Sequence, residues 1–210
     1  MAKPPLVIGT HNAKKGVELR ELLAPFGFEV CTLADFPEAT EVVEDGTTFA
    51  ENARLKAQQQ AKRLGEWVLA DDSGIEVDAL DGGPGVVSAR FAVLAGVVDQ
   101  PNDQANNRLL LEKLDGLPPT KRGAGYYCHV TLADPAGDIR AESVGRCRGR
   151  IVTEPRGAGG FGFDPLFEVR EYHQTFGELG PEVKRCLSHR GRAMRAIVPA
   201  ICRELGAANA

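Results

Sequence analysis

The chain contains 210 residues, of which 43% are hydrophobic, so it is long and apolar enough to bury a hydrophobic core. Its formal net charge of -4 at pH 7 gives no overall attraction to nucleic acid, and a general DNA- or RNA-binding protein is therefore not expected. Five cysteines without a C-x-x-C pair argue against a disulfide framework and a zinc site. We find no signal-peptide pattern and no apolar segment of membrane-spanning length, so we expect a cytoplasmic protein with no membrane partner.

The first third of the chain alternates apolar runs with amphipathic helices. Asn12 is expected to cap one helix, and Thr48 with Glu51 three positions later predicts a capping box for a second, longer helix. Short apolar runs between these signals predict buried strands at residues 6–10, 28–33 and 67–70.

The remainder predicts a hairpin with its turn at residues 134–137 and a last helix. Before the hairpin, it predicts a helix of about a dozen residues that carries Leu109, Leu110, Leu111 and Leu114. Pro199 marks either a kink in that helix or a late start. Early helix–strand alternation followed by a hairpin indicates an α/β protein with a mixed sheet, whose topology does not follow from the pattern.

Asp71 and Asp72 directly follow the apolar run at residues 67–70. Burying two neighbouring carboxylates costs several kcal/mol unless a cation compensates them. Oxygen ligands suit magnesium or manganese better than zinc, and a carboxylate from the acidic loop at Glu44 and Asp45 is a candidate second ligand. Taken alone, that loop is typical of a solvated surface.

Residues 10–15 join the end of a strand to the start of a helix and include Lys14 and Lys15. Helix N-termini attract anions through their unpaired amides, so this segment is a candidate phosphate site without the pattern of a Walker loop. The alternative is an ordinary helix start with solvated lysines.

Residues 159–165 combine three glycines with Phe161, Phe163 and Asp164. Glycines let the backbone approach a ligand, and an aromatic ring stacks on a base, although glycine-rich loops without function are common. Lys184 and the Ser188-His189-Arg190 run are either an ordinary basic helix start or hydrogen-bond donors for the carbonyl oxygens of a base.

In chain order, these motifs resemble the inosine-triphosphate pyrophosphatase family of non-canonical purine nucleotide pyrophosphatases over nearly the whole sequence. The matching segments are Thr10-His11-Asn12-Ala13-Lys14-Lys15, residues 48–57, Ala70-Asp71-Asp72-Ser73-Gly74, Pro84-Gly85 with Ser88-Ala89-Arg90, residues 160–165, and Ser188-His189-Arg190-Gly191.

The resemblance implies an elongated, two-lobed α/β fold with a mixed sheet and flanking helices, related to the Maf fold. Residues 1–210 would form one nucleoside-triphosphate pyrophosphatase domain with the active site in the cleft between the lobes. It further implies a homodimer that cleanses the nucleotide pool by magnesium-dependent hydrolysis of dITP, ITP and XTP to the monophosphate and pyrophosphate; manganese is the alternative ion.

The resemblance also assigns roles to residues. Asp72 would be the proton acceptor and, with Glu44, a metal ligand, although Glu41 or Asp45 could reach the same ion; Asp71 would support them. Phosphate and sugar contacts would come from Thr10, His11, Asn12, Ala13, Lys14, Lys15 and Ser73, with help from Lys56. The base would contact Phe161, Gly162, Phe163, Asp164, Lys184, His189 and Arg190.

This sequence departs from the common family pattern at His11, where glycine is frequent, and at Arg185-Cys186, where small or neutral residues are usual. These departures concern fine specificity rather than the reaction. Two other readings stay open: a Maf-type pyrophosphatase for modified pyrimidine nucleotides, and a nucleotide-binding sensor without turnover.

Overall fold

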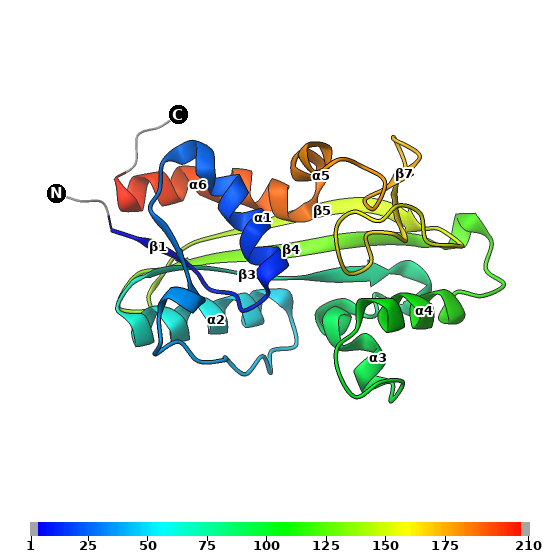
Figure 1. Ribbon diagram of the computed structural model, residues 1–210, viewed down its shortest axis with the longest axis horizontal. Helices are drawn as coiled ribbons and strands as arrows, with labels where there is room; N and C mark the ends of the chain where they lie inside the picture. The colour runs from blue at the N-terminus through cyan, green and yellow to red at the C-terminus, as the bar shows by residue number, and fades with distance from the viewer. Residues whose placement is uncertain (1–3, 207–210) are drawn as a thin grey trace. The chain divides into compact units, whose positions relative to one another are not determined.

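The structure is a computed structural model that describes residues 4–206 (Figure 1). The chain divides into two compact units. Among the described residues, unit 1 comprises 4–73, 128–145 and 189–206, and unit 2 comprises 74–127 and 146–188.

Seven strands hydrogen bond in the order β2-β1-β3-β4-β5-β6-β7. β1 pairs in parallel with β2 and β3, whereas β6 pairs antiparallel with β5 and β7, so the predicted α/β fold with a mixed sheet is confirmed. The strands are β1 (Leu6–Ile8), β2 (Val30–Thr32), β3 (Trp67–Val77), β4 (Gly123–Ala133), β5 (Ile139–Ile151), β6 (Phe167–Val169) and β7 (Gln174–Thr175).

In unit 1, helices cover both faces of the strands (Figure 1). Leu6 and Ile8 of β1 pack with α1 (Ala13–Leu23) and α6 (His189–Leu205), while Val7 between them packs with α2 (Phe49–Leu64). This alternation follows from the two-residue period of a strand, and β1 is fully buried because both of its faces are covered.

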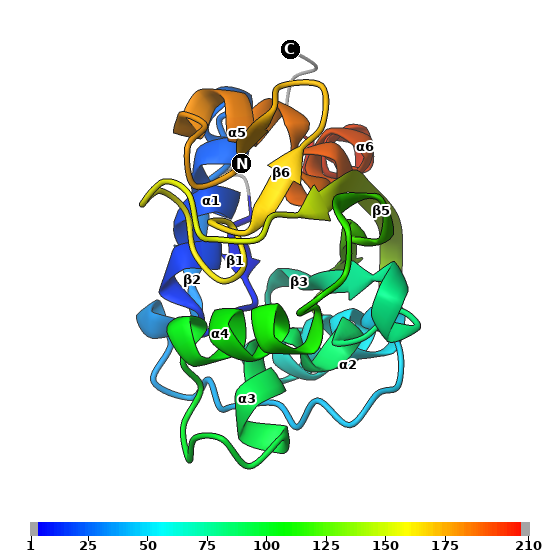
Figure 2. The same ribbon diagram turned by 90° about the vertical axis from the view of Figure 1, so that its right-hand side faces the viewer.

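Unit 2 has its own core of aromatic and aliphatic side chains, in which Tyr126, Phe167 and Phe176 pack against one another. Its helices are α3 (Phe91–Leu94), α4 (Asp103–Lys113) and α5 (Pro181–Leu187). α3 and α4 lie against each other (Figure 2) and bury Ala92 with Ala105 and Leu109.

Most of the predicted elements are confirmed. Asn12 caps α1, and Thr48 and Glu51 form the expected capping box of α2. All five cysteines are free thiols. In the described part of the chain, no helix is long and apolar enough to cross a membrane.

Two local predictions are wrong. β3 does not end at Ala70 but continues through both aspartates to Val77, because cationic side chains described below compensate the carboxylates within the strand. Of the two alternatives at Pro199, the late start is wrong, because Pro199 lies inside a helix that begins at His189; the kink stays a prediction. The apolar stripe of α6 packs into the unit 1 core, and this packing outweighs the single hydrogen bond that proline cannot donate.

Candidate active site

The turn from β1 into α1 is held by its own side chains. Thr10 Oγ1 accepts a hydrogen bond from the Asn12 amide at 3.2 Å. Asn12 Oδ1 accepts from the amides of Lys14 and Lys15 at 3.0 and 3.1 Å. Three amides of the segment predicted to bind phosphate therefore already have a partner, and the lysine side chains become the main candidate phosphate ligands of this segment.

Glycine is required directly after β1. A Cβ on Gly9 would lie 2.8 Å from Val68 Cγ1 and 3.2 Å from the Cβ of Ala70. The backbone of this turn thus approaches β3 more closely than a side chain would permit. His11, Asn12 and Ala13, which follow in the turn, are exposed.

Asp71 is the centre of a buried ionic network in unit 1. It is fully buried, and its Oδ2 lies 3.0 Å from Arg190 Nη2 and 3.4 Å from Lys15 Nζ. Ser73 Oγ donates to the same oxygen at 3.1 Å. Burial raises the pKa of Asp71, but the charges of Lys15, Arg190 and Lys56 outweigh this effect and hold its pKa well below the ordinary value.

Arg190 connects three elements of unit 1. From α6, its guanidinium donates to Asp71 and to Ser73 Oγ on β3, the latter at 2.9 Å, and it also donates to Glu18 on α1. The sequence placed Arg190 at the purine base, whereas the structure surrounds it with carboxylates and a hydroxyl; its contact with a base stays a prediction. His189, the preceding residue, is also buried in unit 1.

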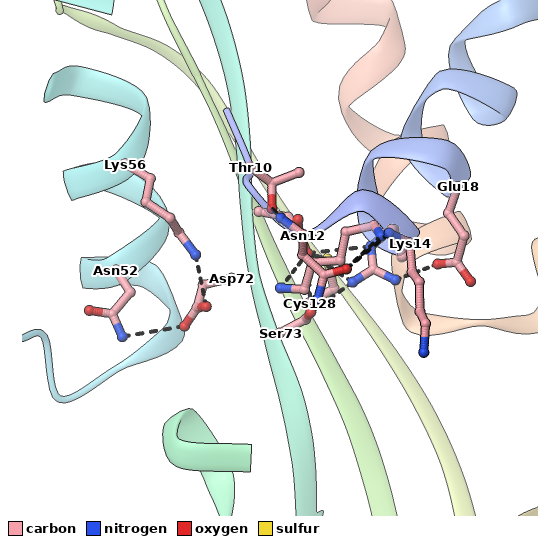
Figure 3. Close-up of polar contacts among 12 residues, drawn as sticks. Thr10, Asn12, Lys14, Glu18, Asn52, Lys56, Asp72, Ser73 and Cys128 are labelled. Carbon is pink, nitrogen blue, oxygen red and sulfur yellow. Dashed lines mark hydrogen bonds and ion pairs between the residues drawn. The ribbon is translucent and has the colours of Figure 1, made fainter. Parts of the chain in front are cut away.

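Asp72 points to the other side of β3, toward α2 (Figure 3). Lys56 Nζ lies 3.0 Å from Asp72 Oδ1 and 3.0 Å from Glu44 Oε2, so these two carboxylate oxygens are at most 6.0 Å apart. Burial raises the pKa of Asp72; Lys56 and Lys15 lower it again only in part. The same structure therefore keeps Asp71 a permanent anion and makes Asp72 the more basic carboxylate.

Asn52 fixes the acidic loop relative to Asp72. Its Nδ2 donates to Asp72 Oδ2 at 3.4 Å (Figure 3). Its Oδ1 accepts from the Gly46 amide at 2.9 Å. The bond to Gly46 ties the acidic loop to α2. From this loop, Glu44 contacts the ammonium group of Lys56, which Asp72 also contacts. Glu44 and Asp72 thus share one ammonium group, and their roles as metal ligands stay a prediction.

In unit 2, the structure brings together three of the residues predicted to bind the base. Asp164 Oδ2 accepts from the Phe161 amide and from Lys184 Nζ, both at 2.7 Å. Lys184 Nζ also lies 4.7 Å from the centre of the Phe161 ring, a cation–π geometry. Phe163, in contrast, packs in the hydrophobic core of unit 2.

Sequence reasoning missed Glu18, Asp103 and Asn107, which contact predicted site residues. Glu18 had one available signal, because it lies three and four positions after Lys15 and Lys14 and so on the same face of α1. For Asp103 and Asn107 no local signal existed, since their partner Gly162 is 59 and 55 positions away in the sequence.

Comparison with known proteins agrees with the motifs. The chain is 52% identical over 198 residues to a dITP/XTP pyrophosphatase of Rhodopirellula baltica, covering 94% of this chain and 93% of the relative. It is 50% identical over 190 residues to a dITP/XTP pyrophosphatase of Desulforamulus reducens, covering 90% and 92%. A HAM1 protein structure from Coxiella burnetii matches with a TM-score of 0.84 at 33% identity, over 95% of this chain and 99% of that one.

These likenesses confirm the predicted resemblance. The model of the Ham1 family matches residues 6–200, and the chain belongs to the Ham1 family.

Proposed function

We propose that this protein hydrolyses non-canonical purine nucleoside triphosphates, namely dITP, ITP and XTP, to the monophosphate and pyrophosphate. The names of its relatives support this substrate class. The observation that carries the proposal is the pair formed by Asp72 and Glu44 on Lys56, beside a second, permanently ionised aspartate. This arrangement combines a carboxylate that can accept a proton with cations that can neutralise the charge of a triphosphate.

The residues of unit 1 fit a magnesium ion. Among residues 4–206, Glu44 Oε2 and Asp72 Oδ1 each lie 3.0 Å from the ammonium group of Lys56, so two carboxylate oxygens, the donor type that magnesium prefers, already share one cation. Within the same range, no three His, Cys, Asp or Glu side chains form a group able to hold a metal. A magnesium ion does not need three such side chains, because it commonly uses one or two carboxylates and takes water and phosphate oxygens for its other ligands. Glu44 and Asp72 would hold the ion.

In the proposed reaction, Asp72 accepts a proton from the water that attacks the α-phosphorus. The ammonium groups of Lys15 and Lys56 neutralise the triphosphate oxygens and the departing pyrophosphate. A magnesium ion, when bound, supplies further charge neutralisation on the phosphate oxygens. Arg190 holds Asp71 ionised, so that Asp71 keeps Lys15 in the site.

In unit 2, Phe161 would stack on the base, and Lys184 would donate to a 6-oxo group. A site built to donate at this edge rejects a 6-amino purine, because the donor then loses its partner. Low kcat/KM for ATP relative to ITP therefore belongs to the proposal. We also propose a homodimer in the cytoplasm, which sedimentation and fractionation would test.

Pyrophosphate release is the direct test. With magnesium, the purified protein should release pyrophosphate from dITP, ITP and XTP much faster than from ATP or dTTP. Asp72→Asn, which removes the proton acceptor, should lower kcat by about 100-fold or more. The control Asp99→Asn makes the same change at an exposed residue and should leave kcat unchanged.

Each rival reading has its own outcome in this assay. Hydrolysis confined to pyrimidine nucleotides would favour a Maf-type enzyme. Tight binding of ITP without pyrophosphate release would favour a sensor, and full activity of Asp72→Asn would overturn the assigned mechanism.

A further inference from the structure

Helix α4 holds Gly162, the residue that follows Phe161, at both of its backbone polar groups. Asp103 Oδ2 accepts a hydrogen bond from the Gly162 amide at 2.9 Å. Asn107 Nδ2 donates to the Gly162 carbonyl at 3.1 Å. The donor and the acceptor of one glycine are thus fixed by two side chains from a helix distant in sequence.

This pair suits α4 because Asp103 and Asn107 are four residues apart and lie on one face of the helix. Asn106, between them, anchors another part of unit 2. Its Oδ1 accepts from the Ala92 amide at 2.8 Å, and its Nδ2 donates to the Ala89 carbonyl at 3.1 Å. Since Leu110 of α4 is also fully buried, the helix is a firm support for the loop.

The loop needs such a support. Gly160 and Gly162, on either side of Phe161, have φ values of 71° and 60°, in the region that favours glycine. Glycine loses the most conformational freedom on ordering, so a loop built on it needs external contacts to stay in one conformation. Asp164 provides one contact at the Phe161 amide, and α4 provides the next two.

We propose that Asp103 and Asn107 are positioning residues that set the ring of Phe161 for the purine base. They act through Gly162, so they govern binding of the base and leave the hydrolysis step untouched. This inference rests on the proposed function, in which Phe161 stacks on the base.

Two matched pairs of variants isolate the two hydrogen bonds. Asp103→Ala and Asp103→Asn both remove the charge at the start of α4, but only Asn keeps an oxygen that accepts from the Gly162 amide. Asn107→Asp and Gln104→Glu both add a negative charge to α4, but only the first removes the donor to the Gly162 carbonyl. Gln104 is exposed.

The readouts are KM and kcat for ITP, together with inhibition by inorganic tripolyphosphate, which has no base. We expect KM to rise about fivefold to twentyfold in Asp103→Ala and Asn107→Asp, the range for a lost hydrogen bond with a partner left unsatisfied. kcat and the inhibition constant of tripolyphosphate should stay within about twofold, and Asp103→Asn and Gln104→Glu should resemble wild type.

An unchanged KM in Asp103→Ala and Asn107→Asp would overturn the inference. Equal weakening of ITP and tripolyphosphate would do so as well, because it would indicate general damage to the fold. A wild-type protein that releases no pyrophosphate from ITP would refute the proposed function instead. Equilibrium binding of ITP and tripolyphosphate to the same variants would then decide the role of α4 by itself.

Discussion

Two adjacent carboxyl groups in one strand, those of Asp71 and Asp72, have pKa values shifted in opposite directions. Asp71 and Asp72 face opposite sides of β3. Arg190 and Lys15 contact the first of them, whereas Lys56 contacts the second. Burial raises the pKa of Asp72 more than Lys56 lowers it, whereas the cations around Asp71 outweigh its burial and lower its pKa. Two carboxylates with separated pKa values commonly divide the roles of acid–base catalysis, which supports Asp72 as the proton acceptor.

Glu142 on β5 is a depressed carboxylate outside this network. Arg54 Nε and Nη2 donate to it at 2.7 and 2.8 Å, and His129 Nε2 lies 2.9 Å from its Oε1. The hydrogen bond from Arg54 is the largest cause that lowers the pKa of Glu142 from 4.5 to about 2.

We expect Glu142→Gln to lower the free energy of unfolding by about 1 kcal/mol at pH 7, the upper end for a partly exposed ion pair. Because the folded pKa is depressed, this contribution is complete above the unfolded value of 4.5 and is lost as the pH falls through about 2. Urea unfolding at pH 7 and at about pH 2.5 should show the difference from wild type shrinking. An equal difference at both pH values would contradict the assignment, and Glu171→Gln, at an exposed site, is the control.

At the scale of elements, α6 approaches β5 through a glycine. A Cβ on Gly145 would lie 2.5 Å from the Ala193 amide nitrogen and would also overlap the His189 carbonyl. These are backbone atoms, which cannot move aside as a flexible side chain would. The start of α6, which carries His189 and Arg190, therefore depends on the missing side chain.

Gly145→Ala should destabilise the protein by about 1–3 kcal/mol, as other overpacked sites do. Gly16→Ala is the matched control with the opposite sign. A Cβ on Gly16 meets nothing within 4 Å, and alanine favours the interior of α1, so it should stabilise by about 0.5–1 kcal/mol. Urea unfolding of both variants tests the packing of α6, and equal stabilities for them would refute it.

At the scale of the whole molecule, local patterns predicted most elements, whereas the roles of the candidate site residues stay predictions. The caps of α1 and α2 were predictable because capping is decided within four residues. The length of β3 was not, because it depends on Arg190, 119 positions after Asp71. The hydrogen bonds of Asp103 and Asn107 to Gly162 were not predictable for the same physical reason, because they form only once distant segments have folded together.

Ligand binding to the whole protein should show coupling between metal and nucleotide. Lys56 already compensates Glu44 and Asp72, so a magnesium ion held by these two carboxylates, as we propose, would compete with an ammonium group for the same oxygens. A triphosphate offers that ammonium other oxygens, so each ligand should favour binding of the other, and this coupling is reciprocal.

Thermal unfolding tests this coupling with magnesium and an α,β-imido analogue of ITP, which resists cleavage of the reacting bond. Each ligand alone should raise Tm by no more than about 2 °C. Both together should raise it by about 5–10 °C, when each is present at about 100 times the Kd that it has in the presence of the other. In Lys56→Met the competing ammonium is absent, so magnesium alone should stabilise this variant more than it stabilises wild type. Lys113→Met removes an ammonium from an exposed position and should respond as wild type does. If magnesium alone stabilised wild type and Lys56→Met equally, Lys56 would not compete with the metal for Glu44 and Asp72.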